Sequence, residues 1–153
     1  MITAWRIVKR RHSGTAFDGE GARQNGGRWN SSGTAMIYVA CTPSLAVLEM
    51  AVHLDRATLL NSYVLIRCEF EEDIVIATDR GSLPRDWRDV PGPHALAAIG
   101  DRWVNSGRSA VLSVPSAIIE QETNYLLNPV HPDFSRITVG SPEPFEFDPR
   151  LIK

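Results

Sequence analysis

The chain has 153 residues, of which 43% are hydrophobic and 22% charged, and its formal net charge is −2. That length suffices for one domain with a substantial core, so we expect a single domain over residues 1–153. The near-neutral charge is not that of a strongly basic, nucleic-acid-binding protein. No apolar run approaches the ~20 residues that a membrane-spanning helix needs.

The N-terminal sequence carries no signal-peptide pattern, from which we expect a cytoplasmic protein. Cys41 and Cys68 each lie inside an apolar, strand-like run. This placement is typical of a small buried hydrophobic residue and not of half a disulfide, and it does not favour a catalytic thiol.

The first half of the chain begins with a short β-prone segment at residues 5–8. Residues 12–33 are rich in Gly, Ser, Asn and charge with little periodicity, which predicts a long loop, and long ordered loops in compact domains are often functional. Residues 35–41 form an apolar run typical of a buried strand. The Thr-Pro pair that follows is an N-cap and a first-turn proline, so we expect a helix over residues 43–55.

The second half alternates strands with one long helix. Residues 63–70 and 74–77 predict strands, and residues 79–93 carry the Gly, Pro, Asp and Arg of a loop. Residues 94–106 predict a helix that ends at Gly107.

Further strands are expected at residues 109–114, 137–139 and 145–147, and the segment 124–128 precedes a Pro-rich turn. The sum is an α+β domain with seven or eight strands and two or three helices, without the regular alternation of a doubly wound sheet.

The segment from Gly26 to Asn30 is the most informative part of the long loop. Its glycines allow the backbone to approach a ligand closely. Arg28 offers a rigid fork of N–H donors that suits phosphate. The segment therefore predicts an anion site against main chain, although a glycine-rich surface loop with a solvated arginine explains it as well.

Glu49 is the only acidic residue in the apolar helical run from Ser44 to Leu54. With about 100° per residue, Glu49 and His53 share a face of that helix. The carboxylate either belongs to a solvent-exposed stripe with His53 or stands in a cleft.

Ser116 follows a strand that Pro115 ends, but no Gly-x-Ser-x-Gly elbow surrounds it and no histidine has the spacing of a catalytic triad. The histidines and cysteines likewise form no zinc-binding pattern, so we expect no metal. Walker A and Rossmann glycine motifs are absent from the sequence. Tyr38 could be a core residue or could present its ring to a flat ligand.

A basic cluster near the N-terminus comprises Arg6, Lys9, Arg10 and Arg11. A solvated strand end explains this cluster at least as well as a binding patch does.

Several of these segments together form an ordered pattern. In chain order they are Phe17–Ala22, Gly26–Asn30, the strand with Tyr38, Leu45–Glu49, Val114–Ser116 and Asn124–Pro129. From about Trp5 to Phe147 the pattern resembles the RES-domain family, the toxins of RES–Xre type II toxin–antitoxin systems. The Arg, Glu and Ser that give the family its name match Arg28, Glu49 and Ser116.

The resemblance implies a fold similar to the ADP-ribosyltransferase fold of diphtheria-type toxins, with mixed sheets. It also implies that the protein degrades NAD⁺, as substrate and not as cofactor, by cleaving the nicotinamide–ribose bond with water or phosphate as acceptor. Glu49, Arg28 and Ser116 would be catalytic, and Arg28, Tyr38, Gly27, Asn30 and Ser116 would contact NAD⁺. Two alternatives remain open, a mono-ADP-ribosyltransferase that modifies a protein and a nucleotide-binding interaction module without turnover.

The expected partner is an Xre-type helix-turn-helix antitoxin that covers the active site, in a complex that could contain a toxin homodimer. Because the chain is mildly acidic, we expect the antitoxin and not this chain to bind DNA strongly.

Overall fold

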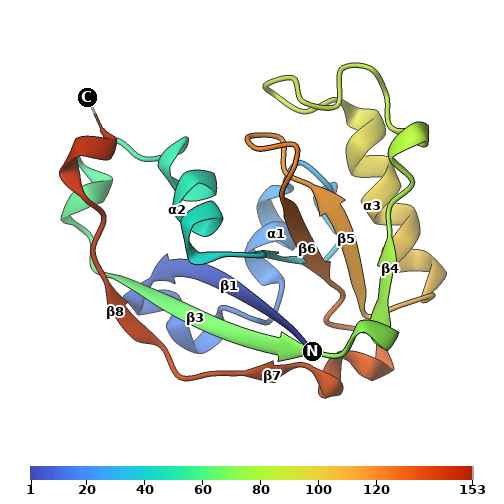
Figure 1. The fold of residues 1–153 in the computed structure, drawn as a ribbon, viewed down its shortest axis with the longest axis horizontal. Helices are drawn as coiled ribbons and strands as arrows, with labels where there is room; N and C mark the ends of the chain where they lie inside the picture. The colour runs from blue at the N-terminus through green and yellow to red at the C-terminus, as the bar shows by residue number, and fades with distance from the viewer. Residues whose placement is uncertain (153) are drawn as a thin grey trace.

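The computed structural model describes residues 1–152, which form one curved eight-stranded sheet with helices packed on it (Figure 1). The strands are β1 (Ile2–Lys9), β2 (Ile37–Ala40), β3 (Tyr63–Phe70), β4 (Val75–Ala77), β5 (Val111–Pro115), β6 (Thr123–Leu127), β7 (Thr138–Val139) and β8 (Glu143–Phe145). The α-helices are α1 (Glu20–Asn25), α2 (Pro43–Ala51) and α3 (His94–Ser106). Short 3₁₀ turns occupy Arg10–Thr15, Thr58–Leu60, Glu72–Ile74, Arg80–Ser82, Pro132–Arg136 and Pro149–Leu151. The α+β class, the strand number and the helix number are as expected from the sequence.

The strand order is β4-β5-β6-β2-β1-β3-β7, and β8 also pairs with β3. Every pairing is antiparallel except β4 with β5, which are parallel and connected through α3. A parallel pair needs such a long crossover because its strands run in the same direction. None of the helices in the described part of the chain combines the length and apolarity needed to cross a lipid bilayer.

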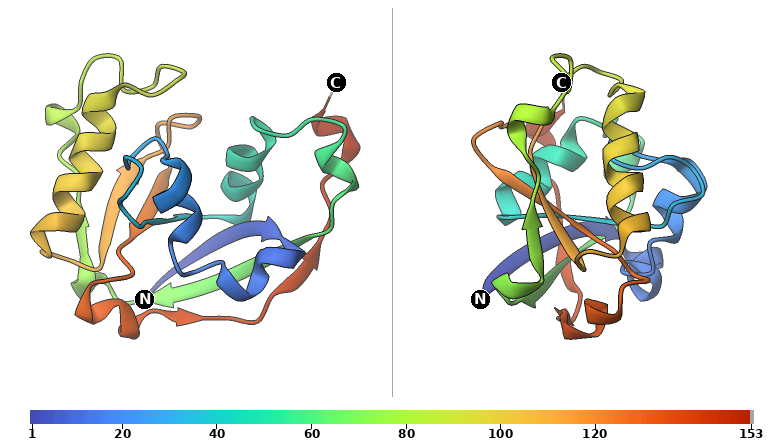
Figure 2. Two further views of the ribbon diagram at one scale, coloured as in Figure 1. Left: turned by 180° about the vertical axis from the view of Figure 1, so that it is seen from behind. Right: turned by 90° about the vertical axis from the view of Figure 1, so that its right-hand side faces the viewer.

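The sheet divides into two halves where β1 meets β2. Only one residue pair joins these strands, Trp5 with Ala40, whereas β1 and β3 pair along eight residues. Arg6 donates from Nη1 to the carbonyl oxygen of Tyr38 at 2.9 Å and from Nε to that of Ala16 at 2.8 Å. The Arg6 guanidinium therefore links β1 to the main chain of β2 and of Ala16. The two halves of the sheet diverge beyond this junction (Figures 1 and 2).

Each half has its own helix. Leu45 and Ala46 of α2 pack with Ile7 of β1 and Tyr63 of β3. On the other half, α3 packs against β5 and β6 through a cluster that contains Leu96, Trp103, Leu112 and Leu126. The two helices thus face different halves of the sheet (Figure 2).

Close backbone packing fixes the long loop against α3. Gly100 of α3 lies so near Trp29 that an added Cβ would sit 1.7 Å from the Trp29 carbonyl oxygen. Asp101 accepts a hydrogen bond from the Ser31 N–H at 2.9 Å. The loop that carries Arg28 is therefore held on a helix, although residues 12–33 contain few apolar residues.

Three local expectations are corrected by the structure. The loop predicted for residues 12–33 contains α1, a six-residue helix that begins after Gly19 in the left-handed region at φ 75°. The helix predicted for residues 43–55 ends at Ala51, where the chain tightens, since the His53 N–H bonds to the Met50 carbonyl. The strand predicted for residues 145–147 is β8, two residues earlier, because Glu143 to Phe145 pair with β3.

Candidate functional site

Glu49 is positioned by the start of α2. The Thr42 hydroxyl accepts a hydrogen bond from the Leu45 N–H at 3.0 Å, and Pro43 occupies the first turn, so the helix begins at a defined residue. Leu45 and Ala46 are buried in the cluster on β1 and β3. One turn later, Glu49 faces the ends of β5 and β6.

The Glu49 carboxylate is bound by two side chains from those strand ends. Its Oε1 accepts hydrogen bonds from Ser116 Oγ at 2.8 Å and from Asn124 Nδ2 at 2.7 Å. Over residues 1–152, Oε2 has no protein hydrogen-bond partner. The structure thus fixes one carboxylate oxygen and leaves the other available to a ligand.

These contacts decide between the two interpretations of Glu49. His53 lies beyond the end of α2 and is exposed, so the i,i+4 pair on a solvent stripe does not form. Glu49 is half-buried and faces two uncharged donors.

Ser116 is completely buried, with an exposed fraction of 0%. Its Oγ donates to Glu49 and accepts from the N–H groups of Ile118 and Ile119, both at 3.1 Å. The hydroxyl therefore orders the turn after β5 and the carboxylate together. This geometry supports a positioning role for Ser116.

Arg28 is bound to the loop before α3. Its Nη1 donates to the carbonyl oxygens of Trp87 and Asp89, both at 2.9 Å. Gly92 packs so closely that an added Cβ would lie 3.0 Å from the same Nη1. Within the described residues, Nε and Nη2 have no protein acceptor, so the edge of the guanidinium that these two nitrogens form remains available to an anion.

The half-buried Tyr38 and the buried Asn30 form a small hydrogen-bond network with the segment that carries Arg28. The Tyr38 hydroxyl donates to Asn30 Oδ1 at 2.6 Å and accepts from the Trp29 N–H at 3.0 Å. Burial raises the pKa of Tyr38, so the phenol is neutral and acts as a donor. Asn30 is 1% exposed and its Nδ2 donates to the carbonyls of Ala22, Ser31 and Thr34. The Asn30 side chain thus ties the loop to its own main chain and to Tyr38.

Gly27 packs directly against the Tyr38–Asn30 network. An added Cβ would lie 2.7 Å from the Tyr38 hydroxyl and 2.9 Å from Asn30 Oδ1. The Gly27 N–H donates to the Asn30 carbonyl at 2.9 Å. The residue is exposed, so its backbone can be approached from solvent while its α-carbon touches the network.

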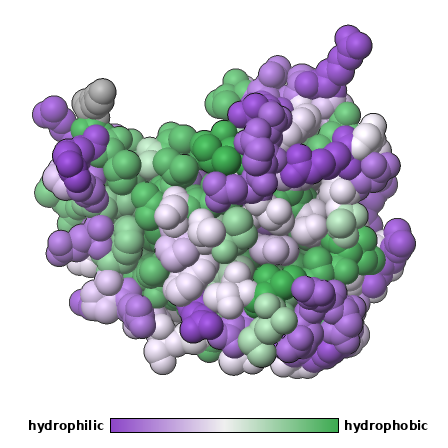
Figure 3. Space-filling model, viewed as in Figure 1, coloured by the Kyte–Doolittle hydropathy of each residue, from purple (hydrophilic) through white to green (hydrophobic). Residues whose placement is uncertain are grey.

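Arg88 connects the Arg28 loop with the Glu49 side. Its Nε donates to the Ala117 carbonyl at 2.9 Å and its Nη2 to the Ile118 carbonyl at 3.2 Å. Glu120 lies 3.7 Å from the Arg88 Nη1. A continuous set of contacts therefore runs from Arg28 through residues 87–92 and Arg88 to the turn that Ser116 orders. In the space-filling view, the upper outline of the molecule dips between its left and right sides (Figure 3).

Sequence reasoning missed Asn124 and Arg88 as functional candidates. Asn124 lies in the segment Asn124–Pro129 that contributed to the family pattern, but nothing in the sequence indicated its contact with Glu49, 75 residues away. Arg88 belongs to a loop whose charged residues look alike in sequence, and only the fold distinguishes it.

Neither thiol is arranged for catalysis. Cys68 is buried, and desolvation raises its pKa to about 12. Cys41 is half-buried, with its Sγ 3.9 Å from a Glu122 carboxylate oxygen. No group of three or more metal-binding side chains occurs within residues 1–152.

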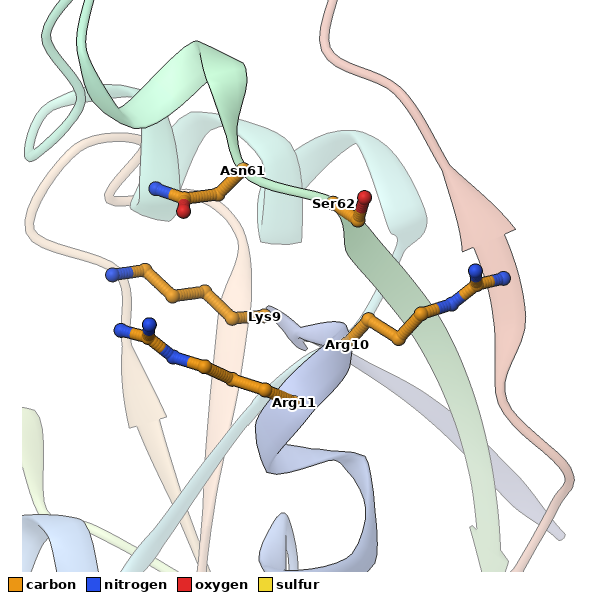
Figure 4. Close-up of a pocket in the computed structure, with 5 residues that line it drawn as sticks. All are labelled: Lys9, Arg10, Arg11, Asn61 and Ser62. Carbon is orange, nitrogen blue, oxygen red and sulfur yellow. The ribbon is translucent and has the colours of Figure 1, made fainter.

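Two cavities lie away from Glu49 and Arg28. One of about 330 Å³ is lined by Lys9, Arg10, Arg11, Asn61 and Ser62 (Figure 4). The other, of about 440 Å³, lies between β4 and α3 and includes Thr78 and Trp103. Glu49 and Arg28 line neither of these two cavities.

Comparisons with known proteins agree with the ordered sequence pattern. The family model described as RES domain matches residues 3–148. A "Toxin Res" of Yersinia enterocolitica is 39% identical over 148 residues, covering 96% of this chain and 97% of that protein. The "Prs ADP-ribosylating toxin" of a Sphingobium strain is 37% identical over 155 residues, covering 97% and 96%.

Among solved structures, the chain superposes with a TM-score of 0.78 on a chain of the M. tuberculosis MbcT–MbcA toxin–antitoxin complex. The sequences are 18% identical, and the match covers 95% of this chain and 84% of that one, which shows a shared fold. Together with the family match over nearly the whole length, these relatives establish that the chain belongs to the RES-domain family.

Proposed function

We propose that the protein cleaves the nicotinamide–ribose bond of NAD⁺ as a growth-arresting toxin. The observation that carries this proposal is the Glu49 carboxylate, with Oε1 held by Ser116 and Asn124 and Oε2 unoccupied by protein groups. A carboxylate fixed in this way suits the stabilisation of a positively charged, oxocarbenium-like sugar.

In the proposed reaction the bond between the ribose anomeric carbon and the nicotinamide nitrogen breaks, and its electron pair stays with nicotinamide. Glu49 stabilises the cationic ribose without forming a bond to it. An oxygen of water or phosphate then bonds to the anomeric carbon, and an attacking water loses its proton to solvent. Glu49 needs no net change of protonation over the cycle.

The remaining residues bind the substrate in this proposal. The free guanidinium edge of Arg28 and the exposed Gly27 backbone contact the pyrophosphate, and the half-exposed ring of Tyr38 contacts nicotinamide. Ser116 and Asn124 position Glu49.

A second candidate is mono-ADP-ribosylation of a protein. The relative named as an ADP-ribosylating toxin of Prs favours it, at 37% identity over nearly the whole of both chains. The same residues serve both reactions, because the two differ only in the nucleophile that attacks the anomeric carbon. A binding module without turnover would not need a carboxylate fixed by two donors.

We further propose that an Xre-type helix-turn-helix antitoxin covers the Glu49 site and holds the toxin inactive. The complex can contain a toxin homodimer. The structural similarity to a chain of a toxin–antitoxin complex supports a protein partner of this kind. A purified toxin–antitoxin complex that still turns over NAD⁺ at the rate of the free toxin would exclude occlusion.

The direct test is to incubate the purified chain with NAD⁺, with and without inorganic phosphate, and to separate the products. Free ADP-ribose identifies a hydrolase, ADP-ribose-1″-phosphate a phosphorylase, and label on a protein from a cell extract a transferase. If NAD⁺ remains intact without phosphate, with phosphate and in the presence of the cell extract, the enzyme proposal is wrong.

A further inference from the structure

A second basic region of the molecule is not used in this chemistry. The cavity at the end of β1 is lined by the consecutive residues Lys9, Arg10 and Arg11 and by Asn61 and Ser62 (Figure 4). We call it the Lys9–Arg11 pocket. Its volume of about 330 Å³ is at the lower end of the range for small-ligand sites.

The pairing of β1 with β3 builds this pocket. Lys9 pairs with Tyr63, and the Arg10 N–H donates to the Ser62 carbonyl at 2.8 Å, which extends the ladder by one bond. The polar side chain of Asn61 is thereby brought beside the cationic side chains. The site is therefore set by strand register and not by a freely moving tail.

Lys9 and Arg11 extend in the same direction, and the Asn61 amide lies on that side too (Figure 4). Arg10 extends the opposite way, toward β8 (Figure 4). The pocket thus has one side with two cations and an amide, and another with a single cation.

No acidic residue balances these charges. Within residues 1–152, none of the ion pairs includes Lys9, Arg10 or Arg11, whereas the chain as a whole carries a net charge of −2. The Arg11 Nε donates a hydrogen bond to His12 Nε2 at 3.3 Å. An anion bound beside Lys9 and Arg11 would be attracted by both positive charges.

We propose that the Lys9–Arg11 pocket binds the phosphate groups of a small polyphosphate, such as a nucleoside diphosphate. Lysine supplies a point charge and arginine a planar fork of donors, a combination that suits adjacent phosphate groups. The methylene stems of the three cations form its walls. A nucleic-acid backbone fits less well, since such sites need a longer basic stripe or patch and the molecule is acidic overall. The proposal is independent of the activity at Glu49.

The test is a calorimetric titration of the purified chain with inorganic pyrophosphate at low salt. The double substitution Lys9→Gln with Arg11→Gln should weaken binding by about tenfold or more, the lower end of what loss of charge-assisted hydrogen bonds produces. Arg56→Gln is the control, because it removes the same charge from an exposed arginine that does not line this pocket. It should change affinity by less than about threefold, as expected for a solvated charge. Thermal midpoints of all variants establish that they are folded.

Two further measurements show whether pyrophosphate binds at this pocket or at Arg28. Arg28→Ala should leave pyrophosphate binding at this pocket in place, and in the unmodified protein pyrophosphate should shift the NMR signals of the Asn61 side-chain amide. Absence of that shift, equal weakening by Arg56→Gln, or loss of binding only in Arg28→Ala would overturn the proposal. Tighter binding of a single-stranded oligonucleotide without terminal phosphates than of pyrophosphate would also overturn it, in favour of nucleic acid.

Discussion

At the scale of single residues, the site depends on which groups hold the Glu49 carboxylate. Ser116 and Asn124 both donate to Oε1, but they differ in what else they do. Ser116 also accepts two main-chain N–H groups and is fully buried, whereas Asn124 is half-buried. Their substitutions should therefore separate folding from catalysis.

We predict that Ser116→Ala lowers both stability and NAD⁺ turnover, since it leaves the Ile118 and Ile119 N–H groups without their acceptor. Buried unsatisfied donors cost about 1–3 kcal/mol each. Asn124→Ala should lower turnover with a smaller loss of stability. Thermal unfolding and steady-state NAD⁺ consumption of the two variants measure the difference, and equal effects on both quantities would contradict the assignment.

For Arg28 we predict that Arg28→Ala weakens NAD⁺ binding more than Arg28→Lys, because lysine keeps the charge but loses the fork. The alanine variant should lose on the order of 1.5–3 kcal/mol of binding free energy. Titration with NAD⁺ measures this, and an unchanged affinity of Arg28→Ala would remove the arginine from the pyrophosphate role.

The two thiols should differ in reactivity. Cys68 is buried and its pKa is raised to about 12, so the nucleophilic thiolate is scarce below that pH in the folded protein. We expect iodoacetamide at pH 8 to modify the half-buried Cys41 and to spare Cys68, as read by mass spectrometry. Modification of both at the same rate in the native protein would show that the core around Cys68 opens readily.

At the scale of elements, Arg88 joins the loop that holds Arg28 to the turn after β5 that Ser116 orders. Arg88→Gln should release the loop that holds Arg28 from the carbonyls of Ala117 and Ile118. We predict a higher KM for NAD⁺ with a small change in thermal midpoint, because Arg88 is exposed. Arg85→Gln is the control, since it is exposed in the same loop and takes part in no described hydrogen bond or ion pair. If both variants raise KM equally, the effect is one of general charge.

The contact of α3 with the long loop is a second element-scale feature. Gly100→Ala would place a Cβ against the Trp29 carbonyl, so α3 and the Arg28 segment cannot keep their present distance. We expect a lower thermal midpoint and lower NAD⁺ turnover. Gly21→Ala is the matched change in α1, where nothing lies within 4 Å of the added Cβ, and it should be neutral or slightly stabilising. Similar losses in both variants would argue against the packing explanation.

At the scale of the whole molecule, the bounds of a helix or strand could be predicted from the sequence where its local signals are strong. Residues 63–70 and 94–106 were predicted with their observed bounds, since a β-branched and aromatic run and a glycine C-cap mark them. The helix α1 was missed because it is short and glycine-flanked. The family pattern selected Glu49, Arg28 and Ser116, but the hydrogen bonds from Asn124 and Arg88 join segments far apart in the chain. Such contacts depend on how the sheet curves.

The Glu49 carboxylate is the central group of the proposed reaction, because it stabilises the cationic ribose during cleavage of NAD⁺. Glu49→Gln keeps the shape of the side chain but removes its charge, so packing of α2 should survive while the cationic sugar loses its stabiliser. The control is Glu146→Gln, an exposed acid in no described ion pair.

The decisive measurement is the rate of NAD⁺ consumption by the unmodified protein, by Glu49→Gln and by Glu146→Gln, with their thermal midpoints. We predict that the kcat of Glu49→Gln is lower by roughly 10²–10³, while its thermal midpoint stays near normal and most NAD⁺ affinity is kept. Glu146→Gln should have the same turnover and midpoint as the unmodified protein. Undiminished turnover by a folded Glu49→Gln protein would contradict the proposed role of Glu49.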